Sequence, residues 1–226
     1  MKLKSTILYF VILLLASCKD YKIVDTKDEG VIEYDIKYLQ SEKDNPIISL
    51  LPKKLIYKFK KDKIMQKVEG WMGVFLMGGV AKNEENYKAG FMKILSEKYV
   101  FETTLDGESI GYDDYGKIYI NPIDSYKVIA GFKCKAAEVY INDSLKPSFL
   151  IFFTKDLKIK NPNLYNPYSS LKYVLLEFQM SFQKIPMKLT ATSVKFEKVN
   201  DEEFEVPDGY RKVSLEKMQE VINNLM

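Results

Sequence analysis

The chain has 226 residues, of which 46% are hydrophobic, 13% aromatic and 29% charged. This composition excludes a disordered or collagen-like chain, and the length allows one large β-rich domain or two small ones. The formal net charge is only +3, from 34 basic and 31 acidic residues spread along the chain, so nothing indicates a nucleic-acid partner.

Two absences narrow the chemistry further. The chain contains no His, and Arg211 is its single arginine. Imidazole catalysis and His-ligated zinc are therefore excluded, and bidentate arginine clamps on phosphate or carboxylate are hardly available. We accordingly expect no cofactor, no metal site and no catalytic residues, and the sequence alone does not define a biochemical activity.

The N-terminus has the order of a secretory signal. Over residues 1–18 a lysine-containing stretch precedes a short apolar run and then small residues, and this run is too short for a membrane span of roughly 20 residues. The segment Leu15-Ala16-Ser17-Cys18 resembles the bacterial lipobox, whose Cys receives a diacylglycerol and becomes the first mature residue. We predict a lipoprotein signal peptide over 1–17 and lipidation of Cys18 with palmitate-type chains. The alternative is an ordinary secretory signal.

Residues 18–29 are polar and predict a lipidated tether, followed by one β-rich domain over 30–226. In enteric lipoproteins an Asp directly after the lipidated Cys resembles an inner-membrane retention signal, and here Lys19 occupies that place. The expected location is therefore the cell envelope, on the outer membrane, facing either the periplasm or the cell surface. The expected partner is the membrane itself, which the protein contacts through the lipid on Cys18.

From Val31 onward the hydrophobic residues alternate with polar ones, which is typical of strands with one face on a core. The predicted strands are 31–38, 55–60, 64–68, 87–95, 98–103, 117–120, 126–141, 148–154, 173–182 and 187–199. Turn signals separate them, Asn121-Pro122 among these. So many short strands predict a mainly β (α+β) fold, a strongly curved antiparallel sheet or half-barrel. Ser214 then begins a C-terminal helix with an apolar stripe.

The stretch from Trp71 to Val80 is uncharged and contains the single Trp of the chain. One interpretation is a flexible apolar flap over a lipid-sized cavity, or a loop that enters the membrane, because Met and Gly repack easily. The other is a buried helix or strand pair that closes the mouth of the barrel. On the first interpretation the candidate ligand-binding residues are Trp71, Met72, Phe75, Leu76 and Met77.

The densest acidic cluster comprises Asp106, Glu108, Asp113 and Asp114. A calcium loop that began at Asp106 would need oxygen ligands where Ile110 and Lys117 stand. The Gly-containing turns around the cluster instead predict a solvated hairpin tip between strands.

Two further side chains carry reactive groups. Cys134 shares a strand face with Phe132, which favours a buried, inert thiol over a reactive one. Glu177 lies in the apolar stretch 174–178, where burial would raise its pKa and suit it to hydrolysis. The alternative places Glu177 on a polar outer face.

The segments 129–137, 152–157, 175–178 and 204–214 resemble Bacteroidetes envelope lipoproteins of unknown function of the GLPGLI type. The motif that names that group is replaced here by residues 168–174. The resemblance implies an open half-barrel similar to LolA, LolB and LppX, whose concavity holds acyl chains, and it brings no catalytic residues.

The expected function is non-catalytic binding of an apolar ligand, an acyl chain or a lipoprotein, in the concavity of the sheet. The first alternative is a structural or protein-interaction lipoprotein whose barrel is filled by its own side chains. A carboxylate-based envelope hydrolase is a third. An aliphatic cavity of at least about 300 Å³ would favour the first function, and a filled interior the second.

Overall fold

The computed structural model describes residues 28–70, 73–110, 112–142, 144–145 and 148–224. Its strands are β1 (Glu29–Tyr38), β2 (Lys54–Lys60), β3 (Lys63–Gly70), β4 (Phe75–Lys82), β5 (Tyr87–Ile94), β6 (Glu97–Thr103), β7 (Ile118–Ile129), β8 (Phe132–Ile141), β9 (Phe149–Thr154), β10 (Val174–Phe182), β11 (Ile185–Lys195) and β12 (Arg211–Lys212). The helical elements are the short 3-10 helices η2 (Pro46–Leu50) and η4 (Asp201–Phe204) and the helix α2 (Leu215–Asn223).

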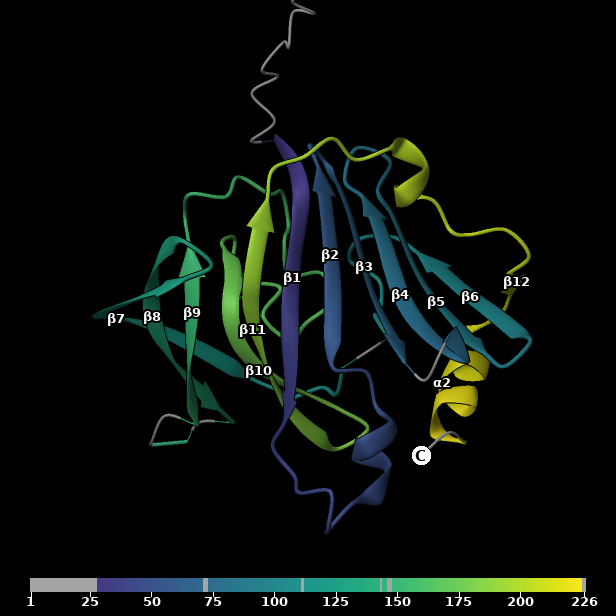
Figure 1. Ribbon diagram of the computed structural model, residues 1–226, viewed down its shortest axis with the longest axis horizontal. Coiled ribbons are helices and arrows are strands. Elements are labelled where there is room, and N and C mark those ends of the chain that lie inside the picture. The colour runs from purple at the N-terminus through teal and green to yellow at the C-terminus, as the bar shows by residue number, and fades with distance from the viewer. Residues whose placement is uncertain (1–27, 71–72, 111, 143, 146–147, 225–226) are drawn as a thin grey trace, which may run out of the picture.

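All twelve strands belong to one sheet, in the order β12-β6-β5-β4-β3-β2-β1-β11-β10-β9-β8-β7. Neighbouring strands pair antiparallel, apart from the two-residue parallel pair of β12 with β6. The two ends of this order are not paired with each other, so the sheet is an open, curved half-barrel (Figure 1). The predicted fold, a curved antiparallel sheet with a C-terminal helix, is confirmed.

The concave face of the sheet holds the main core. On β1, Ile32, Tyr34 and Ile36 are buried on this face, while the residues between them are more exposed, as their period of two predicts. They join one apolar cluster with side chains from β8, β9, β10 and β11, for example Phe153 and Leu176. Burial of this shared face holds the curved sheet together.

Two loops enter the concavity. The segment 104–117 joins β6 to β7, strands near opposite ends of the sheet, and so crosses the open side. Along the way Ile110 packs against β5 at Gly90, and the Asp113 backbone N–H donates to the carbonyl of Ser181 on β10. The second loop, 155–173, buries four large side chains in the main core: Leu157, Ile159, Tyr165 and Tyr168.

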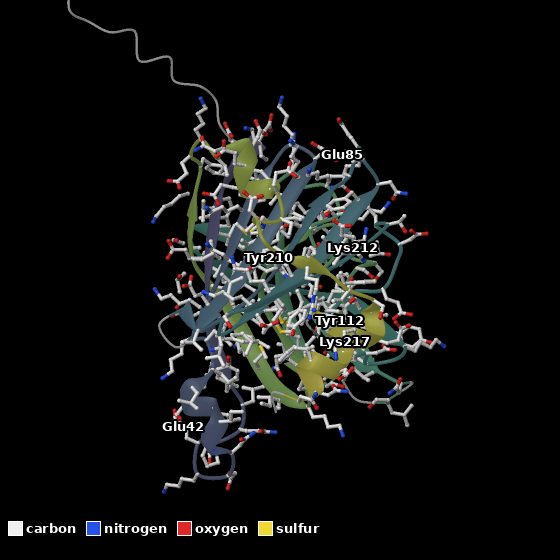
Figure 2. The ribbon with its side chains drawn as sticks, turned by 90° about the vertical axis from the view of Figure 1, so that its right-hand side faces the viewer. Glu42, Glu85, Tyr112, Tyr210, Lys212 and Lys217 are labelled. Carbon is white, nitrogen blue, oxygen red and sulfur yellow. The ribbon has the colours of Figure 1, made fainter. Side chains whose placement is uncertain are left out.

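The C-terminal segment before α2 packs on the other face of the sheet. Val199 and Phe204 pack with Met65, Val80 and Phe91 on the convex face, opposite the main core. Figure 2 shows the chain continuing from η4 through β12, near Tyr210 and Lys212, to α2.

The helix α2 begins as predicted. The Ser214 hydroxyl accepts a hydrogen bond from the Lys217 backbone N–H at 3.2 Å. Met218 and Ile222 are buried against Met92 and Tyr99 of β5 and β6. The apolar stripe of the helix therefore packs on the sheet.

Of the two interpretations of the stretch 71–80, the buried strand is confirmed for residues 75–80, which belong to β4 and are covered on both faces, and the flap is wrong for them. Three other local predictions are wrong. The predicted strand 126–141 is a hairpin that turns at Ala130 and Gly131, both at positive φ. Asn121-Pro122 lies inside β7. The acidic segment 106–114 belongs to the loop that crosses the concavity rather than to a hairpin tip.

Candidate apolar binding site

A cavity of about 90 Å³ remains at one end of the concavity. Its walls are mainly apolar and include Met77 of β4, Met180 of β10 and Met187 of β11. Five of the lining residues lie at or near strand ends, and we infer that the cavity opens on this side: Tyr38, Pro52, Phe75, Phe182 and Ile185. Flexible methionine side chains on three separate strands give this cavity an adaptable lining.

One wall of the cavity is the ring of Tyr165, which lies directly on β4. A Cβ atom at Gly79 would be 2.4 Å from this ring, so the close approach requires glycine there. The Tyr165 hydroxyl donates to the carbonyl oxygens of Val80 and of Ala89, the latter at 3.0 Å. Burial raises the pKa of Tyr165 well above its usual value, and the phenol stays neutral. In the sequence, the signal for this close approach is the Gly78-Gly79 pair.

The crossing loop is tied to the sheet by a buried lysine. The Lys88 ammonium donates to the carbonyl oxygen of Gly107 at 2.7 Å, to the Ser109 hydroxyl at 2.8 Å and to the carbonyl oxygen of Leu105 at 3.2 Å. Burial lowers the pKa of Lys88, since the charged form loses water. The sequence did not predict this contact, because a lysine in a strand is usually a solvent-facing residue.

The carboxylates of the acidic cluster have separate local roles. Asp113 accepts hydrogen bonds from the backbone N–H groups of Gln183 at 2.9 Å and Lys184 at 2.6 Å, and so fixes the β10–β11 turn beside the mouth. Asp106 accepts from the Thr104 hydroxyl, and Asp114 from the Gly116 N–H. Within the described part of the chain, no group of three His, Cys, Asp or Glu residues is placed to hold a metal ion.

The structure brings only some of the predicted ligand-binding residues to the cavity. Phe75 and Met77 line it. Leu76 points to the opposite face and packs in the convex-face cluster. Trp71 and Met72 lie outside the described residues, as does Cys18. No signal in the sequence marks the lining residues of β10 and β11 as part of a cavity, because their pattern is that of ordinary buried strand residues.

Cys134 is fully buried, and its thiol donates to the carbonyl oxygen of Phe132 at 3.5 Å. Burial raises the pKa of this thiol to about 11. The nucleophilic thiolate is therefore scarce at neutral pH, which confirms the expectation of a buried, inert Cys134.

Glu177 is 4% exposed, yet it is paired with two lysines. Its carboxylate oxygens lie 2.6 Å from the Lys127 ammonium and 2.7 Å from that of Lys188. Burial by itself would raise the pKa of Glu177, but the hydrogen bonds from both lysines outweigh it and the pKa lies below its usual value. The interpretation of a buried carboxyl with a raised pKa is therefore wrong. The alternative holds: Glu177 pairs with Thr190, whereas the next residue, Phe178, pairs with the core residue Leu189, so Glu177 lies on the outer face as an ionised, paired carboxylate.

No known family model matches the chain, and no curated protein matches it. The resemblance to GLPGLI-type lipoproteins stays a prediction from the residues that carry it. Within the described ranges, no helix combines the length and apolar character needed to cross a membrane.

Proposed function

We propose that this protein is an envelope lipoprotein, anchored through Cys18 to the outer membrane, that binds an apolar ligand without catalysis. The observation that carries the binding proposal is the methionine-lined cavity. The driving force is the removal of hydrocarbon from water, which contributes about 0.8 kcal/mol for each buried methylene before the costs of ordering the ligand.

The size of the cavity narrows the ligand. Its volume of about 90 Å³ is well below the roughly 300 Å³ at which drug-sized pockets begin, because the loops 104–117 and 155–173 occupy much of the concavity. A single narrow hydrocarbon chain fits this space better than a lipid with several chains or a lipoprotein. The proposed ligand is therefore one aliphatic chain.

Two neighbouring residues of β4 provide a matched test. Met77 lines the cavity, and Leu76 is also partly buried but faces the opposite side of the sheet. Met77→Trp should fill the cavity and lower the affinity for N-phenyl-1-naphthylamine, an apolar fluorescent probe, by about tenfold or more, whereas Leu76→Trp should leave binding unchanged. Circular dichroism verifies that both variants are folded. Equal binding by both variants would place the probe elsewhere and remove the proposal.

The filled part of the concavity favours a second candidate, a structural or protein-interaction lipoprotein. Tyr165 and Tyr168 of the 155–173 loop occupy space that a ligand would take in an open half-barrel, and both are buried. This candidate predicts that the unmodified protein binds none of the probe.

A further inference from the structure

The cavity continues toward a second, smaller one. This second space has a volume of about 20 Å³ and shares four wall residues with the first: Leu55, Gln66, Asn166 and Phe178. A volume of that size is enough for about one water molecule. Of the shared residues, Gln66 and Phe178 lie inside β3 and β10 rather than at the strand ends, and we infer that they mark the deep end of the main cavity.

Gln66 brings a free polar group to this deep end. On β3 it alternates with Met65 and so shares the concave face with Ile64. Its side-chain amide has no hydrogen-bond partner among the residues that the structure describes, whereas the Asn166 side chain donates to Asn163 at 3.2 Å and accepts from the Tyr168 N–H at 3.0 Å. Gln66 is partly exposed, so this amide is open to water or to the polar group of a ligand.

The surroundings of Gln66 are uncharged. Lys67 lines the cavity, but it alternates with Gln66 on β3, so its side chain leaves the strand on the convex face with Met65. The nearby hydroxyls of Tyr34 and Tyr57 already donate to backbone carbonyl oxygens, at 2.8 Å and 3.2 Å. Burial raises the pKa of both tyrosines, so they remain neutral. An anionic head group would lose its water here and find no cation.

We infer that the ligand is a neutral aliphatic molecule with one hydrogen-bonding head group, such as an alcohol or a primary amide. It enters head first: the head group binds the Gln66 amide, and the hydrocarbon lies among the methionines and extends to the mouth. This inference rests on the proposed function, and it adds a selection for neutral over anionic ligands.

The test uses four ligands of equal chain length: octanol, octanamide, octane and octanoate, above neutral pH. Binding is followed through the methionine methyl signals in NMR spectra, where Met77, Met180 and Met187 report on the cavity, and Met65 and Met218 lie in other clusters. We expect octanol and octanamide to bind at least about tenfold more tightly than octane and octanoate.

Gln66→Leu should remove this preference and leave octane binding unchanged. Gln179→Leu is the matched control, because Gln179 is also partly buried but alternates with the cavity residues Phe178 and Met180. If octanoate binds as tightly as octanol, or if Gln66→Leu keeps the preference, the inference is overturned while the apolar cavity stands. If none of the four ligands shifts the cavity methionines, the proposed function fails as well.

Discussion

The substitution Gly79→Ala tests whether the contact between β4 and Tyr165 shapes the cavity. The new Cβ would lie 2.4, 2.6 and 3.0 Å from three atoms of the Tyr165 ring, closer than atoms can pack. The ring cannot simply swing away, because it is 5% exposed and its hydroxyl is bound to Val80 and Ala89. Either the ring or β4 must shift.

The expected cost follows from three contributions. Overpacking of this kind costs about 1–3 kcal/mol, and a weakened buried hydrogen bond costs about 1 kcal/mol more. The smaller entropy of the unfolded alanine chain offsets about 0.4–1 kcal/mol. The net loss is about 2 kcal/mol, equivalent to a fall in Tm of about 4–8 °C for a domain of this size.

Thermal and urea unfolding, followed by circular dichroism, measure this loss. The same substitution in a Tyr165→Ala background isolates the contact, because the Cβ then meets no ring and Gly79→Ala should become nearly neutral. An equal loss in both backgrounds would show that the cost comes from elsewhere in β4 and would refute the packing argument.

Three further predictions concern stability. Glu177→Gln should cost about 1–2 kcal/mol at neutral pH, less than for a fully buried pair because Lys127 and Lys188 are 46% and 34% exposed. Because the pKa of Glu177 in the folded protein is lowered, its stabilising effect is complete above the usual value of 4.5 and is lost as the pH falls through the folded pKa. In urea unfolding, the free energies of unfolding of the unmodified protein and of Glu177→Gln should therefore converge in acid. Lys88→Met should lower the free energy of unfolding by about 2 kcal/mol and speed amide hydrogen exchange at residues 105–109. Unchanged exchange there would contradict the role of Lys88 in holding the loop to the sheet. Ser214→Ala should cost about 1 kcal/mol in urea unfolding, and no loss would contradict its role as helix cap.

The sequence predicted the strands that have one solvent-exposed face. On β1 the alternation of Ile32, Tyr34 and Ile36 with polar residues was sufficient, as was Ser214 for the start of α2. At β4 the sequence left a flap and a buried helix or strand open, because a strand covered on both faces shows no alternation. It failed for the turn at Ala130-Gly131, which lacks the usual Asn-Gly or Asp-Gly signal.

The site was less predictable than the fold. Met77 stood out because its neighbours are uncharged, but Met180 and Met187 became lining residues through the pairing of β10 with β11. The crossing of the concavity by the loop 104–117 depends on strand order, since β6 and β7 lie near opposite ends of the sheet. Strand order arises from long-range contacts that a local pattern does not encode.

The most direct test of the account is native mass spectrometry of the protein in its natural form, purified from the membranes of its own cells. We predict one noncovalent aliphatic molecule for each chain, retained in Leu76→Trp and lost in Met77→Trp. A ligand-free unmodified protein, or a ligand retained in Met77→Trp, would contradict the claim that this cavity is a binding site.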